Sequence, residues 1–292
     1  MTDEFGTQLL RTSITSEPDG TVRWTRRPGR SAPNGFSTLG STPVPGTTPS
    51  SGADPRRRDY RVASARSLAD ELFADEPDPV VVEAALAATG RALRLVHGRR
   101  VPDAPSPRSW LRLHHWLTRR PATSMALHAA GHVRDLLGAD RWTLATDLTA
   151  DVVGPRRRTS VIHGAPGIGS VVLGGAPGSA ATLLIGEDLA TGDPVADVGW
   201  TTGELVELAG RAGGGSRWRG FVDALHRGYL GENRVWSPEE NRRVEQYAGL
   251  RILLHLHDFL AYVRYSEAEV RLCTSMASSL LDHAVGDREA IA

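Results

Sequence analysis

The residue types that can do chemistry gather in one stretch of this 292-residue chain, from Thr159 to Asp197. His163 begins a glycine-rich loop, and an imidazole can act as an acid or a base near neutral pH. Two adjacent carboxylates, Glu187 and Asp188, follow a short aliphatic run and can transfer protons or attract a cation. The stretch therefore predicts a binding or catalytic site that is built from two loops.

Three short β-branched or aliphatic segments predict the strands that position these loops, at Thr159–Ile162, Val171–Leu173 and Ala181–Ile185. The first loop contains three glycines whose backbone N–H groups could form an anion nest. These glycines are Gly164, Gly167 and Gly169. A phosphate site is the weaker interpretation, because the loop has no lysine and no G-x-x-x-x-G-K pattern.

The first loop resembles the catalytic loop of the aminoglycoside phosphotransferase and choline kinase family, which reads H-G-D-x-x-x-x-N. His163 and Gly164 match its first two residues. Ala165 stands where the family has its catalytic Asp, and Ser170 stands where it has a metal-binding Asn. In these kinases the Asp accepts the proton of the substrate hydroxyl, and the Asn helps to hold magnesium. The resemblance implies a loop without its catalytic groups.

The second loop resembles the family pattern I-D-x-E followed by G-D-P-x-x-D. Glu187 matches the x-E, and the run G-D-P-V-A-D at 192–197 matches the second part. Ile185, however, replaces the magnesium-binding Asp. A register shift of three residues would recruit Asp188 instead, but it needs a loop deletion that the G-D-P spacing argues against.

Three residues of these motifs are expected to be structural. In the family the His holds the loop backbone, so His163 is expected to do the same. Asp193 and Asp197 are expected to serve architecture, with Asp193 tying its loop to the next helix by accepting backbone hydrogen bonds. All 34 basic residues are arginine, so the family's phosphate-binding strand lysine is absent, and arginine lacks its compact ammonium geometry.

The resemblance covers about residues 80–283 and implies an α+β fold: a mostly helical protein-kinase-like C-lobe with a small central β-sheet. We expect a C-lobe at 63–292 and an N-terminal arm at 1–62. In that arm, 7–16 and 21–27 predict a hairpin, so the N-lobe is expected to be reduced to at most a hairpin. The Ser-, Thr-, Pro- and Gly-rich segment 30–55 predicts a flexible linker.

Apolar residues at helical spacing, with capping residues before them, predict the helices of the C-lobe. The expected helices are Val80–Val96, one after Ser106-Pro107, Thr123–Leu137, Glu204–Arg211 with a Thr201-x-x-Glu204 capping box, one around Trp218–Tyr229, one from Ser237 to about Tyr265, and Glu267–His283.

Composition excludes several classes. The net charge is zero and the hydrophobic share is 40%, which suits a folded core and argues against a general nucleic-acid binder. The single cysteine, Cys273, excludes an intramolecular disulfide framework. No apolar run is long enough for a signal peptide or a membrane span, so we expect a cytoplasmic protein without a membrane or nucleic-acid partner.

Other clusters carry weaker predictions. His128, His132 and Asp135 fall at i, i+4 and i+7 of an expected helix, but a solvated helix flank is the favoured interpretation over a metal site. His255 and His257 face different ways and are poor joint ligands. The arginine runs at 56–58 and 156–158 are expected to be solvated loop charges. We expect no metal and no cofactor.

These observations indicate a catalytically degenerate phosphotransferase-fold protein, a pseudokinase, that binds a peptide or a partner protein. The expected ligand-binding residues are His163, Gly164, Gly167, Gly169, Glu187 and Asp188. An apolar floor at Ile185 and an acidic rim at Glu187 and Asp188 would suit a peptide with a basic flank or a cationic small molecule.

Proteins of this kind resemble accessory kinase homologues of lanthipeptide and thioamide peptide natural-product pathways. Two roles stay open: a scaffold within a modification complex, or a peptide cyclase or lyase that uses His163, Glu187 or Asp188 for proton transfer. The alternative from another class is a divergent, active small-molecule phosphotransferase that uses Asp188 as its metal ligand.

Overall fold

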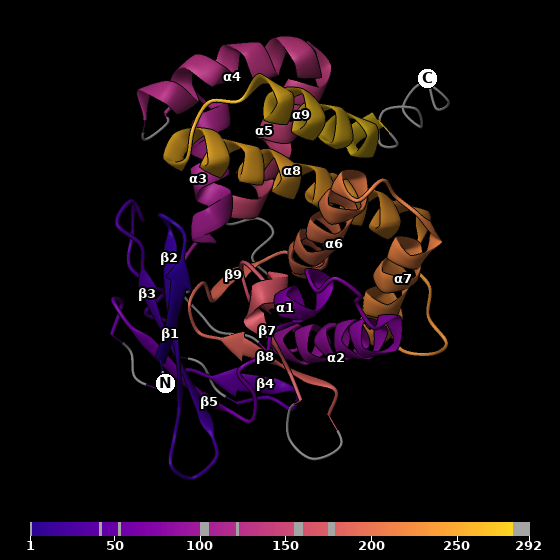
Figure 1. The fold of residues 1–292 in the computed structure, drawn as a ribbon. Helices are drawn as coiled ribbons and strands as arrows, with labels where there is room; N and C mark the ends of the chain where they lie inside the picture. The colour runs from indigo at the N-terminus through magenta and orange to yellow at the C-terminus, as the bar shows by residue number, and fades with distance from the viewer. Residues whose placement is uncertain are drawn as a thin grey trace.

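The computed structural model describes residues 2–40, 43–51, 54–99, 105–120, 123–154, 160–174 and 179–282. An N-terminal antiparallel sheet lies beside a larger, mostly helical C-lobe, so the α+β class and the helical C-lobe are confirmed (Figure 1). The helices α4 and α9 lie at the top of the view, farthest from that sheet's lower end.

The N-terminal sheet has four strands in the order β1-β2-β3-β5. They are β1 (Thr2–Gly6), β2 (Leu10–Ser16), β3 (Val22–Pro28) and β5 (Arg58–Val62). The expected hairpin is present as β2 and β3, but β1 and β5 flank it. The expectation that the N-lobe is reduced to at most a hairpin was therefore wrong. Trp24 and Tyr60, each 1% exposed, are directly opposite each other and bury the inner face of this sheet.

The segment between β3 and β5 packs on the C-lobe and differs from the expected flexible linker. Its strand β4 (Thr47–Pro49) pairs in parallel with β8 (Ala181–Ile185). Phe36 is buried, and the backbone N–H of Ser37 donates to the carbonyl of Glu187 at 2.7 Å. The segment has few apolar side chains to bury, but backbone groups of the C-lobe form hydrogen bonds with its polar groups and hold it in place.

The C-lobe consists of helices around two small sheets. The helices are α1 (Leu68–Leu72), α2 (Pro79–His97), α3 (Arg108–Leu117), α4 (Ser124–Leu137), α5 (Ala139–Val153), α6 (Pro194–Arg211), α7 (Ser216–Leu230), α8 (Pro238–Tyr262) and α9 (Glu267–Asp282). The sheets are β4-β8-β7, with β7 at Val171–Leu173, and β6-β9, with β6 at Ser160–Ile162 and β9 at Ala190–Gly192.

Most of the expected helices are present, but two are additional and one begins elsewhere. The short α1 and the long α5 were not expected. The capping box at Thr201 was wrong, because α6 already begins at Pro194, after its N-cap Asp193. Thr201 lies inside that helix and donates its hydroxyl to the carbonyl of Pro166. The Ser237–Glu240 capping box of α8 is confirmed.

The longest helices pack closely at glycines. A Cβ built on Gly203 of α6 would lie 2.6 Å from the carbonyl oxygen of Ala248 in α8, so only glycine fits there. Between α2 and α7, a Cβ on Gly228 would lie 2.1 Å from the carbonyl oxygen of Ala87. The backbones of both helix pairs, α6 with α8 and α2 with α7, therefore come into direct contact.

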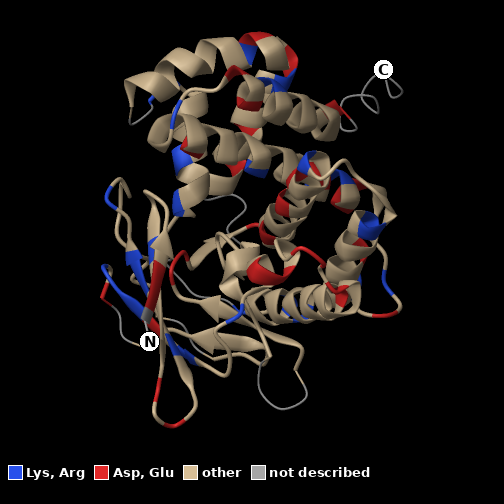
Figure 2. Cartoon of the chain, in the orientation of Figure 1, with Lys and Arg blue, Asp and Glu red and all other residues tan. Residues whose placement is uncertain are grey.

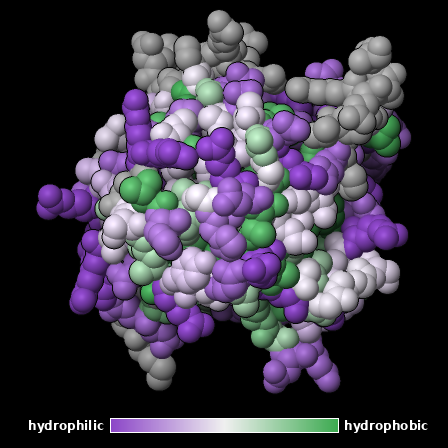
Figure 3. Space-filling model, turned by 90° about the horizontal axis from the view of Figure 1, so that it is seen from above, coloured by the Kyte–Doolittle hydropathy of each residue, from purple (hydrophilic) through white to green (hydrophobic). Residues whose placement is uncertain are grey.

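In the view of Figure 2, basic and acidic residues are interspersed on both lobes. On the face over α4 and α9, apolar side chains are scattered among polar ones (Figure 3). Within the described residues, no helix combines the length and the apolar character that a membrane crossing requires.

Candidate functional site

A cleft of about 430 Å³ lies between the N-terminal sheet and the C-lobe, and both predicted loops open onto it. The turn between β1 and β2 contributes Leu9, β3 contributes Arg26, and the segment after β3 contributes Phe36. The C-lobe contributes the glycine-rich loop, the 187–188 loop, α3, α6 and α8. The two loops that the sequence singled out therefore lie together at the junction of the lobes.

His163 is fixed inside the protein. It is 4% exposed, and its Nε2 donates to the carbonyl of Leu184 at 2.8 Å. Its Nδ1 lies 3.4 Å from the backbone nitrogen of Ala165, which donates to it. Both ring nitrogens are occupied by backbone groups, so the imidazole holds the loop and presents no free nitrogen for proton transfer.

Asp197, in α6, holds the backbone of the glycine-rich loop that begins at His163. It is fully buried and accepts hydrogen bonds from the backbone N–H groups of His163, at 2.6 Å, and Gly164, at 2.9 Å. His97, at the end of α2, also contacts this carboxylate through Nε2 at 2.9 Å. Its Nδ1 contacts the hydroxyl of Tyr229 at 3.0 Å. Sequence reasoning missed His97 and Tyr229, which anchor the loop to α2 and α7.

Asp193 is the N-cap of α6. Its side chain accepts from the backbone N–H of Val195 at 3.1 Å and from the hydroxyl of Tyr247 at 2.9 Å, and it forms an ion pair with Arg243. The residue is 3% exposed. These contacts link the 186–193 loop to α6 and α8, which is the architectural position that the G-D-P motif implies.

In the glycine-rich loop, a protein carboxylate already accepts a backbone N–H group that could otherwise contact an anion. The N–H of Ile168 donates to Glu204 at 2.8 Å, and a Cβ on Gly167 would lie 3.3 Å from the same carboxylate. Glu204 in turn forms an ion pair with Arg251 at 3.0 Å. A protein carboxylate thus already lies where a bound anion would contact this loop.

Gly164 has a positive φ of 90°, and a Cβ there would lie 2.2 Å from the carbonyl oxygen of Asp188. This glycine lets the two loops come into contact. The carbonyl of Gly169 accepts from the guanidinium of Arg26 at 2.6 Å. The close approach at Gly164 therefore joins the two loops, whereas Gly167 and Gly169 line the cleft, and their contact with a ligand stays a prediction.

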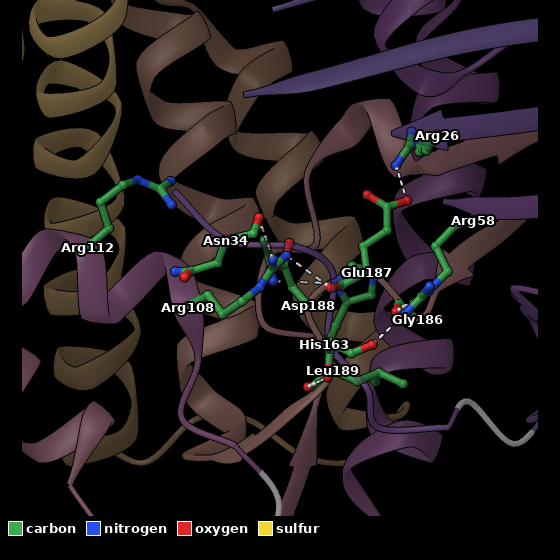
Figure 4. Close-up of polar contacts among 12 residues, drawn as sticks. Arg26, Asn34, Arg58, Arg108, Arg112, His163, Gly186, Glu187, Asp188 and Leu189 are labelled. Atoms are coloured by element: carbon green, nitrogen blue, oxygen red, sulfur yellow. Dashed lines mark hydrogen bonds and ion pairs between the residues drawn. The ribbon is translucent and has the colours of Figure 1, made fainter. Parts of the chain in front are cut away.

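Glu187 is buried, at 8% exposed, and not on an open rim. Its Oε1 accepts from Arg26 at 2.9 Å and from the hydroxyl of Tyr60 at 2.8 Å. Burial, together with the charge of Glu187, holds the pKa of Tyr60 well above its usual value, so the phenol stays a donor. Figure 4 shows Glu187 pointing toward Arg26.

Asp188 lies on the opposite side of the same loop and is paired as well. Arg108, from the first turn of α3, donates from Nε to its Oδ1 at 2.8 Å, and also donates to the carbonyl of Glu187 at 3.0 Å (Figure 4). The two loop carboxylates are each neutralised by an arginine. The expected acidic rim for a basic peptide flank was wrong, because long-range arginine partners cannot be read from the local sequence.

Arg26 is a further residue of the site that sequence reasoning missed. It comes from β3, and its side chain is 4% exposed. One guanidinium nitrogen, Nη1, contacts both the hydroxyl of Ser170 and Glu187 at 2.9 Å. The N-terminal sheet therefore inserts a permanent cation between the two loops. The signal available in the sequence was the pair Arg26-Arg27 at the end of an alternating strand.

Ile185 is not the floor of the cleft. It ends β8, is 3% exposed and belongs to the main core of the C-lobe. Pro49 of β4 pairs with it, and its carbonyl accepts from the N–H of Ser50. An aspartate at this position would be buried among apolar side chains, which is unfavourable without a partner.

The remaining clusters form no metal site within the described part of the chain. His132 contacts Glu267 at 3.1 Å, His255 contacts Glu207, and His257 contacts Asp258 at 2.8 Å. Of the first arginine run, Arg58 is buried, and its Nε donates to the carbonyl of Gly186. The run at 156–158 lies outside the described residues.

None of the protein-family models matches this chain, and no curated protein matches it in sequence. Its structure is similar to an ethanolamine kinase from Plasmodium vivax, with 11% identity, a TM-score of 0.53, and coverage of 96% of this chain and 81% of the kinase. It is also similar to a candidate aminoglycoside phosphotransferase from Ralstonia eutropha, with 12% identity, a TM-score of 0.50, and coverage of 98% and 92%. The chain therefore has the kinase-like fold of these two structures.

Proposed function

We propose that this chain is a phosphotransferase-fold protein that does not transfer phosphate and that uses the cleft between its lobes to bind a peptide or partner protein. One observation carries this proposal: Arg26 joins Ser170 and Glu187. A buried guanidinium thus lies between the two loops from which a kinase of this fold would hold its magnesium ions.

The two loop carboxylates, Glu187 and Asp188, are also already paired with arginines. Magnesium requires carboxylate, carbonyl or water oxygens in near-octahedral geometry. Ala165 provides no side-chain ligand, and Ile185 faces the core. Glu187 and Asp188 are each engaged by an arginine, and a divalent cation placed beside these guanidinium groups would be repelled by them. The alternative with Asp188 as the metal ligand would require Arg108 to leave it.

The lining of the cleft favours an uncharged occupant. Leu9, Phe36 and Trp200 supply apolar surface, while the carboxylates of Glu204 and Asp258 are paired with arginines. A volume of about 430 Å³ accommodates a few side chains of a peptide or one small molecule. We infer that apolar or neutral polar side chains enter the cleft, and that a basic flank contributes little.

The peptide partner is, in this proposal, the substrate of a modification complex of the lanthipeptide or thioamide type, with the present chain as the component that holds it. The support is the resemblance of the damaged loops, because fold alone does not determine function. His163 is not the acid or base of a cyclase in this proposal, since both of its ring nitrogens contact backbone groups.

Phosphoryl transfer is tested by measuring ADP formation from Mg-ATP at saturating concentration, with and without aminoglycosides, choline and ethanolamine as acceptors. The proposal expects no ADP above the rate in buffer. ADP formation that Arg108→Ala increases and Asp188→Asn abolishes would instead establish the divergent phosphotransferase.

Peptide binding is tested by screening an immobilised peptide library with the parent protein and with two variants. Ala165→Trp fills the cleft, because Ala165 lines it. Ala84→Trp is the matched control, since Ala84 is an exposed residue of α2. The proposal expects peptides that the parent and Ala84→Trp bind and that Ala165→Trp does not. Binding that survives in Ala165→Trp would place the peptide site outside the cleft.

A further inference from the structure

A second groove, of about 740 Å³, lies between α2 and α7. The two helices pack against each other, with α7 on the side of the C-lobe opposite the N-terminal sheet (Figure 1). No residue that lines this groove also lines the cleft, so the two sites are separate. Three arginines line the groove: Arg91 and Arg94 from α2, and Arg227 from α7. None of them belongs to a motif of the kinase-like site.

The helix crossing explains why these arginines flank one groove. A Cβ on Gly90 would lie 2.2 Å from the carbonyl oxygen of Leu225, so the backbones of α2 and α7 are in contact. Ala87, Gly228 and Gly231 leave the groove floor without bulk. Arginines on the neighbouring turns therefore extend along both sides of a shallow channel that no larger side chain fills.

The three guanidinium groups are not neutralised. All three residues are exposed, and none forms an ion pair with a residue that the structure describes. Arg94 makes one long hydrogen bond, of 3.5 Å, to the carbonyl of Leu230. The only carboxylate among the described lining residues is Glu232, so the groove has a formal charge of three minus one, or +2.

Interaction with the dipoles at the helix C-termini explains only part of the positive charge of the groove. Arg94 and Arg227 lie in the last turns of their helices, where a cation offsets about half a unit of dipole charge. Arg91 lies earlier in α2 and has no such role. Elsewhere on the C-lobe, by contrast, Arg211 reaches two carboxylates, Glu207 and Glu269.

We propose that the α2–α7 groove binds an acidic peptide segment of a partner protein. Guanidinium groups present planar forks that match carboxylates, and Arg91 and Arg94 are one helical turn apart. Carboxylates at alternate residues of an extended chain, about 7 Å apart, reach both of them. A nucleic acid is the poorer occupant, because the whole chain has zero net charge and a sequence pI of about 7.2.

The probe for this groove is a short fluorescein-labelled peptide of alternating Glu and Ala, followed by fluorescence anisotropy in about 50 mM and about 300 mM NaCl. The test variant is Arg91→Glu/Arg94→Glu/Arg227→Glu. The matched control is Arg27→Glu/Arg134→Glu/Arg264→Glu, which reverses three exposed arginines on other elements. Melting temperatures of both variants verify that the fold is kept.

The proposal expects saturable binding by the parent, at least tenfold weaker binding by the groove variant, and binding by the control variant within about 1.5-fold of the parent. Binding should weaken in the higher salt, because surface charges are screened. Equal loss in both variants, equal binding of an alternating Gln-Ala peptide, or tighter binding of a labelled oligothymidylate would each overturn it. Should the triple variant unfold, the single change Arg91→Gln, expected to weaken binding about threefold, decides in its place.

Discussion

Replacing Arg26 by Met should destabilise the protein strongly, because it leaves Glu187 buried without its cation. The two side chains are only 4% and 10% exposed. Removing one partner of a buried ion pair typically costs about 3–5 kcal/mol. The lost bonds to Ser170 and Gly169 act in the same direction. Since single domains are stable by about 5–15 kcal/mol, this is a large share of the total.

A double-mutant cycle measures the pair itself. Glu187→Gln keeps an acceptor for the hydroxyl of Tyr60, and the double variant Arg26→Met/Glu187→Gln removes both charges together. We expect the double variant to cost less than the sum of the single variants by about 2 kcal/mol or more. Urea unfolding is followed by tryptophan fluorescence, for which Trp24, in contact with Arg26, is a local reporter.

Arg11→Met is the control for this experiment, because Arg11 pairs with Glu4 on the surface of the same sheet. Exposed ion pairs contribute about 0–1 kcal/mol, so this variant should unfold almost as the parent does. A loss below about 1 kcal/mol for Arg26→Met, or strictly additive single changes, would refute the assignment of Arg26 as a buried link between the lobes.

Three further outcomes follow from the structure. Burial lowers the pKa of His226 to about 4, below its unfolded value of about 6.5. The unfolded chain therefore takes up a proton first as the pH falls, and the free energy of unfolding should decrease by about 3 kcal/mol between pH 6.5 and pH 4. His226→Gln should reduce this pH dependence in urea unfolding, and an unchanged pH dependence would contradict the assignment. Asp193→Ala should lower the free energy of unfolding by more than 2 kcal/mol, about twice the cost of Asp78→Ala, because Asp78 is a more exposed N-cap with fewer partners; equal costs would remove the loop-anchoring role. Gly228→Ala should lower the melting temperature by several degrees, because its Cβ meets backbone, whereas Gly131→Ala, in open space on α4, should not lower it.

The sequence was informative where local pattern and burial agree. The strands Val171–Leu173 and Ala181–Ile185 are mostly aliphatic and are each followed by a glycine, and the structure has them at the same residues. The capping box at Ser237 likewise marks the beginning of α8. In each case the signal lies within a few residues, so no distant partner is needed to interpret it.

The sequence was misleading where distant partners decide the structure. Arg26 and Glu187 are 161 residues apart. From the local sequence alone the loop that contains Glu187 is therefore predicted to be solvated, because its partner Arg26 belongs to the distant N-terminal sheet. The helix α5 follows Gly138, which provides no side-chain cap, and its beginning carries no local signal. The polar segment around Phe36 looked flexible because its hydrogen-bond partners belong to the C-lobe.

Calorimetric titration of Mg-ATP into the full chain tests the central claim most directly. The account predicts no binding heat with a dissociation constant below about 1 mM, which corresponds to a binding free energy weaker than about −4 kcal/mol. This result is expected because Arg26 and Arg108 pair with the two loop carboxylates, Glu187 and Asp188, and because Ile185 is buried. Binding with a dissociation constant below about 1 mM that EDTA abolishes would contradict the account, because it would show that the cleft keeps a site for a metal-bound nucleotide.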